Sequence, residues 1–360
     1  MTLADPVIGN VVRDVRSVAV LLPVFIDTAI KGSFVLALCA LAARWARRSS
    51  AAGRHAIWTA GILGHLFLPV FTWYAPPIYW QVLPAPPWLT AANGFSSTGD
   101  LIPHDRAAQV LALCAVLWLT GVLVLLARIV TAWFLVTRLG HDCRAAANET
   151  FQPLAKRITQ SVAVRPRIAL LYHPGIAVPI AWGVFSPRIV LPAALETWSE
   201  TELEAILAHE IEHIRRHDVL TQLAAQVTLA LFWFDPLLWM AARRMRYERE
   251  LACDDAVVLL GIDRWKYAEG LLRAARELRE RQIASNMLAA ITGDGLLEID
   301  RRIRALLDPS TDRHSPRTAA WITAVLILLL FELPLGALRP FRWNDSAANR
   351  LAPPPEAPRL

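Results

Sequence analysis

The stretch with the clearest chemical meaning contains His209, Glu210 and His213, which together form a His-Glu-x-x-His pattern. Two histidines four positions apart stand on the same face of a helix, about one turn from each other. Their imidazoles can therefore bind one Zn²⁺, while the glutamate between them reaches a metal-bound water as general base. The alternative is a charged helix whose histidines are only solvated, so the surrounding sequence must decide.

The sequence around this pattern predicts a helix that begins after Ser199 and continues to Asp218. Ser199 followed by Glu202 forms a capping box, and acidic residues are concentrated in the first turns. No Pro or Gly interrupts the segment, and apolar residues recur at helical spacing. These apolar residues are Leu203, Ile206, Leu207, Ile211 and Ile214. Because the pattern falls on a helix of the correct polarity, we favour the zinc site over the solvated helix.

A catalytic zinc site needs a third protein ligand, and His217 is the first candidate because it continues the four-residue series. Its Cα would lie about 12 Å along the helix axis from that of His209, whereas ligands cluster about 2 Å from one metal. Without a glycine turn before it, His217 cannot reach the same ion. We therefore expect His217 at the surface or at an interface.

A better candidate lies later in the chain, where Glu250 and Asp254 are four residues apart and share a helix face. One carboxylate can bind the metal, and the other can accept a hydrogen bond from a zinc-bound histidine and orient its ring. The alternative is a helix with surface ion pairs formed by Arg246, Glu248 and Arg249. With the histidine pattern present, we predict Glu250 as third ligand and Asp254 as the orienting partner.

The composition is that of a polytopic membrane protein with a modest water-facing part. Of the 360 residues, 55% are hydrophobic and only 19% are charged, and the mean hydropathy is +0.37. We interpret the net charge of +6 as a signal of membrane orientation. No basic cluster interleaved with aromatic residues supports direct nucleic-acid binding. The four cysteines form no Cys-x-x-Cys pair, so neither a disulfide framework nor a thiolate zinc site is expected.

Four apolar runs predict four membrane spans, at residues 18–43, 55–74, 107–139 and 319–338. The loop between the first two is rich in arginine, so the positive-inside rule places it in the cytoplasm and the N-terminus outside. The predicted order is an N-terminal membrane region with an external loop, a cytoplasmic domain, a fourth span and a short external tail. These parts cover residues 1–137 with the loop at 75–106, then 138–315, 316–338 and 339–360.

Within the cytoplasmic domain, short β-type runs at 167–172, 176–182 and 188–191 predict a small sheet directly before the histidine helix. An edge of this sheet could align an extended peptide as an added strand. Residues 145–162 suggest an amphipathic helix despite Pro153, and two further helices are expected over 241–260 and 267–282.

The apolar segment at 219–234, which could continue to 240, is too short for a usual span. We interpret it as interfacial or re-entrant. A true span is the alternative, but it would place His213 and Glu250 in different compartments and prevent them from sharing a metal.

The succession of motifs resembles the BlaR/MecR-type membrane zinc metallopeptidases, the signal transducers of β-lactam resistance. After the histidine pattern come Arg-Arg-His-Asp at 215–218, Phe-Trp-Phe-Asp-Pro-Leu-Leu-Trp at 232–239, Glu-Leu-Ala-Cys-Asp at 250–254 and Tyr-Ala at 267–268. The element at 250–254 is also similar to that of HtpX/Ste24-type peptidases. The resemblance covers most of the chain, from the first span to the fourth.

This resemblance implies that His209, His213 and Glu250 hold one catalytic Zn²⁺, that Glu210 is the base, and that Asp254 lies behind the ligands. It further implies a mainly α-helical protein of the bacterial inner membrane, with a gluzincin-like α+β peptidase domain on the cytoplasmic side between spans three and four. In such transducers the peptidase responds to an external signal and inactivates a winged-helix transcriptional repressor.

One departure from the family changes the expected function, because its sensors carry an external penicillin-binding domain after the last span. Here only residues 339–360 follow, so direct β-lactam sensing is not expected. The alternatives are an HtpX/Ste24-like membrane quality-control protease, which would cut many substrates, and a non-catalytic transducer, which would not need Glu210. A homodimer is compatible with the sequence.

Overall fold

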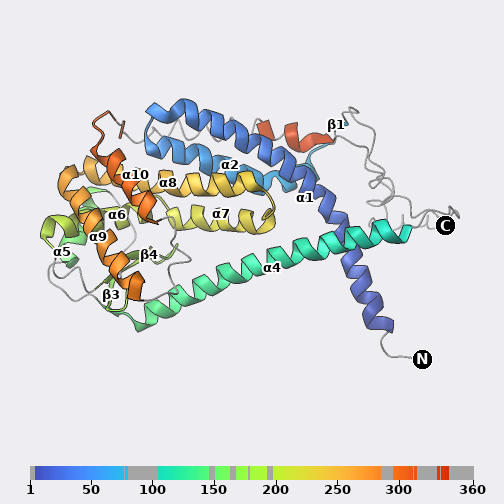
Figure 1. Ribbon diagram of the computed structural model, residues 1–360, viewed down its shortest axis with the longest axis horizontal. Helices are drawn as coiled ribbons and strands as arrows, with labels where there is room; N and C mark the ends of the chain where they lie inside the picture. Colours follow the sequence, from blue (N-terminus) through green and yellow to red (C-terminus); the bar gives the residue numbers. More distant parts are fainter. Residues whose placement is uncertain are drawn as a thin grey trace, which may run out of the picture. The chain divides into compact units, whose positions relative to one another are not determined.

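The computed structural model describes residues 5–76, 78–79, 104–145, 151–162, 168–176, 179–192, 198–284, 295–310, 312–313, 331–332 and 334–339. The described chain is mainly helical, with a small four-stranded sheet and a pair of two-residue strands (Figure 1). It divides into two compact units. The first contains Met1–Lys31, Phe67–Gly121 and Leu329–Leu360, and the second contains Gly32–Leu66 and Val122–Leu328.

Three described helices are long and apolar enough to cross a membrane, and they coincide with the first three predicted spans. They are α1 (Asp5–Trp45), α2 (Ala51–Tyr74) and α4 (His104–Asp142). Most of the predicted fourth span lies outside the described residues, as do most of the predicted external loop and the tail. In the first unit, β1 (Ile78–Tyr79) pairs in parallel with β6 (Leu338–Arg339).

The second unit is built around α6 (Glu200–Arg215), the helix that carries the histidine pattern. The predicted capping box is present, because the Ser199 hydroxyl accepts the Glu202 N–H and the Ser199 N–H donates to the Glu202 carboxylate at 2.8 Å. Leu207 and Ile211 on its apolar face are fully buried. They belong to one hydrophobic core with residues of α5 (Phe151–Ser161), β5 (Arg188–Pro192) and α9 (Arg264–Ala284).

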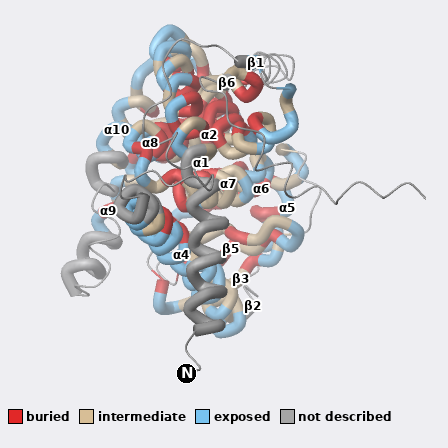
Figure 2. The backbone as a smooth tube through the Cα atoms, turned by 90° about the vertical axis from the view of Figure 1, so that its right-hand side faces the viewer, coloured by how far each residue is buried: buried red, intermediate tan, exposed pale blue. Residues whose placement is uncertain are grey.

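The sheet has the strand order β2-β3-β5-β4, with β3 (Ala169–His173) parallel to β5 and the other pairs antiparallel. Strand β5 is buried (Figure 2), whereas β4 (Ile180–Trp182) stands at an edge. The three predicted β runs therefore form strands. Strand β2 (Arg144–Ala145) was not predicted, since two residues carry no alternation.

Helix α5 occupies the predicted amphipathic segment but begins at Phe151 rather than at Ala145, which belongs to β2. Pro153 lies in the first turn of α5, where the missing N–H breaks no internal hydrogen bond. The amphipathic prediction is correct in type, and the buried side of the helix faces α6.

After α6 the chain forms a helical hairpin instead of one continuous apolar segment. Helix α7 (Asp218–Leu231) ends near Phe232, and α8 (Pro236–Leu259) returns beside it (Figure 1). The side chain of Asp235 caps α8 by accepting the N–H groups of Leu237 and Leu238 at 2.9 and 3.4 Å. With 14 residues, α7 is about 21 Å long, shorter than a hydrocarbon core of about 30 Å. The return of α8 brings Glu250 back towards His213.

Candidate metal centre

Three side-chain atoms from α6 and α8 converge on one point. The Nε2 atoms of His209 and His213 lie 3.2 Å apart, and Glu250 Oε2 lies 3.5 and 3.8 Å from them. Ligand atoms at the corners of a tetrahedron about 2.0–2.1 Å from zinc are about 3.3 Å apart. The spacing of the three atoms therefore fits Zn²⁺ with a fourth position left open, and the two imidazoles and one carboxylate are a donor set that zinc accepts.

The other ring nitrogen of His209 is held by buried polar groups. Its Nδ1 atom lies 3.2 Å from Asp254 Oδ1 and 3.0 Å from the hydroxyl oxygen of Tyr267. The Tyr267 hydroxyl in turn donates to Asp254 Oδ1 at 2.6 Å. A carboxylate behind the ring fixes the tautomer, so that the lone pair of Nε2 faces the metal position. The structure thus places the Asp254 carboxylate directly behind the His209 ring.

His213 has a corresponding partner, Asp218, that the sequence analysis missed. Asp218 Oδ2 lies 2.8 Å from His213 Nδ1, and the Asp218 side chain is almost fully buried. The prediction of one helix continuing to Asp218 is wrong at its end, because α6 ends at Arg215 and α7 begins at Asp218. The chain turns at His217, whose φ of 56° is left-handed, and this turn carries Asp218 back onto the histidine. A non-glycine residue in this conformation has no clear sequence signal. His217 itself is exposed and away from the three donor atoms, as predicted.

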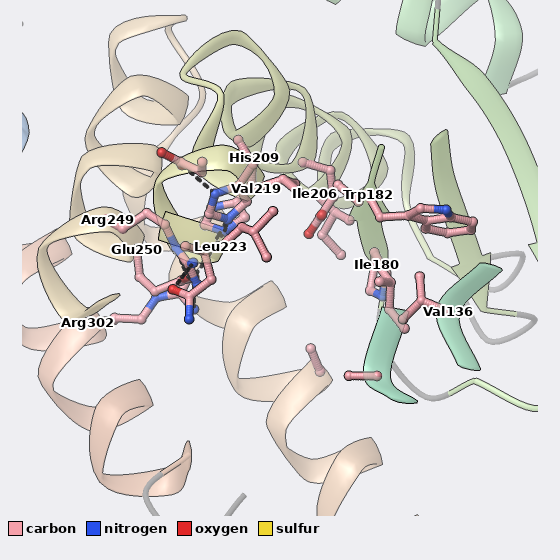
Figure 3. Close-up of a pocket in the computed structure, with 18 of the residues that line it drawn as sticks. Val136, Ile180, Trp182, Ile206, His209, Val219, Leu223, Arg249, Glu250 and Arg302 are labelled. Atoms are coloured by element: carbon pink, nitrogen blue, oxygen red, sulfur yellow. Dashed lines mark hydrogen bonds and ion pairs between the residues drawn. The ribbon is translucent and has the colours of Figure 1, made fainter. Parts of the chain in front are cut away.

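Two arginines surround the carboxylate of Glu250 at one end of the site (Figure 3). Arg249 donates to Glu250 Oε1 at 2.7 and 3.1 Å, which leaves Oε2 for the metal position. Arg302, from α10 (Gly295–Leu307), forms a two-pronged pair with Asp254 at 2.7 and 2.8 Å and lies 3.4 Å from Glu250 Oε2. Helix α10 was not predicted, so this link between Asp254 and Glu250 was also missed.

The electrostatics of the cluster favour a positive charge between the three donors. Burial would raise the pKa of Glu250, but the charge of Arg249 and the hydrogen bond with His209 hold it well below its usual range. Burial would lower the pKa of His209, yet hydrogen bonds to Asp254 and Glu250 raise it to about 9. A metal cation bound at this point would take the place of the proton that these carboxylates attract.

A cavity of about 570 Å³ opens beside the three donors, and Glu210 lines it. Within the described part of the chain, the Glu210 carboxylate has no hydrogen-bond or ion-pair partner, so it is available to a water molecule. The opposite wall is apolar and comes from α4 and β4, where Val136, Ile180 and Trp182 face the cavity (Figure 3). The cavity can therefore hold an apolar group next to the three converging donors and the carboxylate of Glu210.

Comparison with known proteins assigns the chain to a family. A family model described as BlaR1 peptidase M56 matches residues 19–306, which include every residue of the candidate metal centre. The chain belongs to the BlaR1 peptidase M56 family. The resemblance seen in the sequence is thereby confirmed.

Several curated proteins are similar to this M56 family member. Regulatory protein BlaR1 of Bacillus licheniformis is 27% identical over 225 residues, which are 61% of this chain and 36% of BlaR1. The methicillin resistance mecR1 proteins of Staphylococcus aureus and Staphylococcus epidermidis are each 29% identical over 178 residues, 48% of this chain and 30% of theirs. The chain thus spans about a third of the length of the curated relatives it matches.

Proposed function

We propose that this chain is a zinc-dependent endopeptidase of the bacterial inner membrane that cleaves a cytoplasmic transcriptional repressor during signal transduction. The observation that carries the proposal is the convergence of His209, His213 and Glu250 beside a cavity that also contains Glu210. The repressor, a winged-helix protein, is the substrate class that the BlaR/MecR-type resemblance implies. Membership of a peptidase family supports the chemistry.

In this proposal the residues have distinct roles. His209, His213 and Glu250 would hold one Zn²⁺, which when bound supplies a Lewis acid for the scissile carbonyl and makes water more acidic. Glu210 accepts the proton of the attacking water and delivers it to the leaving amine. Asp254 and Asp218 keep the two imidazoles oriented through their Nδ1 atoms.

Strand β4 supports a protein substrate rather than a small molecule. Among the described residues it pairs only with β5, so its other edge is free. Residues of β4 line the cavity next to Glu210. An extended peptide can add to a free strand edge through main-chain hydrogen bonds, which would lay its scissile bond along the metal centre.

The hairpin of α7 and α8 supports a site at the cytoplasmic face of the membrane. At its tip, Asp235 accepts a hydrogen bond from Ser33 at 2.9 Å, and Phe232 packs on His65 with ring centroids 4.4 Å apart. Ser33 and His65 lie in the interior of the candidate spans in α1 and α2. We therefore propose that the hairpin enters the bilayer from the side that carries the arginine-rich loop and returns to that side.

The repressor proposal is tested by comparing the proteomes of cells that contain the wild-type chain or its Glu210→Ala variant. We expect a cleaved repressor only with the wild-type chain, and few other new fragments. A Glu204→Gln variant, which changes a partly exposed acidic residue of the same helix, should behave like the wild type. Many fragments of unrelated membrane proteins would favour the HtpX/Ste24-type quality-control role. Identical repressor levels and fragments in all three strains would contradict the proposal.

A further inference from the structure

A chain of buried polar contacts runs from helix α2 to the candidate metal ligand His213. His55 lies near the start of α2 and is 2% exposed, and its Nδ1 atom is 3.0 Å from Arg216 Nη2. Arg216 Nε lies 3.4 Å from Asp218 Oδ2, and the same oxygen is 2.8 Å from His213 Nδ1. Three contacts thus connect a membrane-span candidate to a ring that faces the metal position.

The chemistry of these contacts fixes the state of each group. A guanidinium has only donors, so His55 Nδ1 must accept the hydrogen bond and His55 must be neutral with its proton on Nε2. The Thr59 hydroxyl, one turn along α2, lies 3.4 Å from that Nε2. Arg216 is therefore positioned between an acceptor on α2 and the carboxylate that orients His213.

A second contact attaches the same end of α2 to the helix of the third ligand. Arg54 pairs with Glu248 of α8 at 2.8 Å, and both side chains are largely buried. Arg54 also donates to the main-chain carbonyl of Ser49, in the segment between α1 and α2. Glu248 lies two residues before Glu250 on α8, so Arg54 attaches α2 to the helix of the third ligand candidate. The next residue of α2, His55, contacts Arg216 at the end of α6. Two consecutive residues of α2 therefore contact both helices that carry the ligand candidates.

An anchoring role alone would require only that α2 pack against the domain. The contacts of His55 do more than anchor α2, because they lead through Arg216 to Asp218, the aspartate that orients the candidate ligand His213. Groups behind a metal-bound histidine typically change metal affinity by about 10–100-fold. A shift of α2 that altered the His55–Arg216 contact would reach the metal site through this path.

We propose that His55 and Arg216 are positioning residues that couple α2 to His213, so that the position of this membrane helix sets the metal affinity of the peptidase site. This inference rests on the proposed function and adds its regulation. It identifies α2 as the element through which a change in the membrane region reaches the metal centre.

The test measures Zn²⁺ affinity by chelator competition in the purified full-length chain, in a Glu210→Gln background that removes any contribution from cleavage. We expect His55→Phe to weaken zinc binding by about 10-fold, because Arg216 loses its acceptor. His55→Asn should retain most of the affinity, since its amide oxygen can occupy the place of Nδ1. Ile62→Val is the matched control on α2, because Ile62 is buried about two turns further along the helix and is not part of this polar chain, and it should bind zinc like the parent.

The outcomes separate this inference from the proposed function. A parent protein that binds no zinc contradicts both. A parent that binds zinc, together with unchanged affinity in His55→Phe, overturns the relay alone, as does an equal loss in His55→Phe and Ile62→Val. If His55→Phe does not fold, His55→Gln replaces it, because the glutamine oxygen corresponds to Nε2 and should not restore the contact with Arg216.

Discussion

Replacing Glu210 with glutamine should abolish peptide-bond cleavage while zinc remains bound. Glutamine keeps the shape of the side chain but cannot accept the proton of the attacking water. Since general acid–base groups contribute about 10²–10⁴-fold to rates, kcat should fall by that order. Zinc affinity should be nearly unchanged, because Glu210 lines the cavity but is not among the three converging donors. The measurement is the rate at which purified protein cuts the repressor, alongside its zinc content.

Glu204→Gln provides the matched control for this prediction. Glu204 lies on the same helix, but its carboxylate forms an exposed ion pair with Arg157 at 2.9 Å. Exposed pairs contribute little, so this variant should cut at the wild-type rate. Undiminished cleavage by Glu210→Gln would remove Glu210 from the mechanism.

Replacing Arg302 with methionine should destabilise the second unit and weaken its zinc site. Arg302 is largely buried and neutralises Asp254 through two short contacts while it also approaches Glu250. Removing one partner of a buried ion pair typically costs about 3–5 kcal/mol, because the other charge is left uncompensated. We expect a clear fall in the midpoint of thermal unfolding and weaker zinc binding. Arg302→Lys should restore only part of both, since an ammonium cannot form the two-pronged pair.

Arg304→Met tests whether such effects are specific to the buried pair. Arg304 lies on the same helix, and its pair with Asp300 is exposed, with 78% and 56% of the two side chains accessible. Its removal should therefore be nearly neutral. If Arg302→Met unfolds at the same temperature as Arg304→Met, the buried pair has no structural importance.

The residues closest to the metal position could be predicted because their signals are local. Helical spacing places His209 with His213 and Glu250 with Asp254, and the capping box at Ser199 marks where the first helix begins. The three candidate spans among the described residues follow from hydropathy, which depends on composition rather than on tertiary contacts.

The groups that orient these residues depend on tertiary structure, and the sequence did not reveal them. Asp218 reaches His213 only because the chain adopts a left-handed conformation at His217. Arg302 reaches Asp254 from a helix 48 positions later, and nothing in its own segment distinguishes it from neighbouring arginines. By contrast, the break between α7 and α8 had a local signal, because Asp235 followed by Pro236 is a typical helix start.

The zinc content of the purified chain tests the central claim most directly. Protein prepared without chelators should contain one zinc ion per chain, and Glu210→Gln should contain the same amount. His213→Ala and Glu250→Ala should each lose the ion, because each removes one of the three proposed ligands that converge within the described part of the chain. A wild-type protein without zinc, or a His213→Ala variant that retains it fully, would contradict the account.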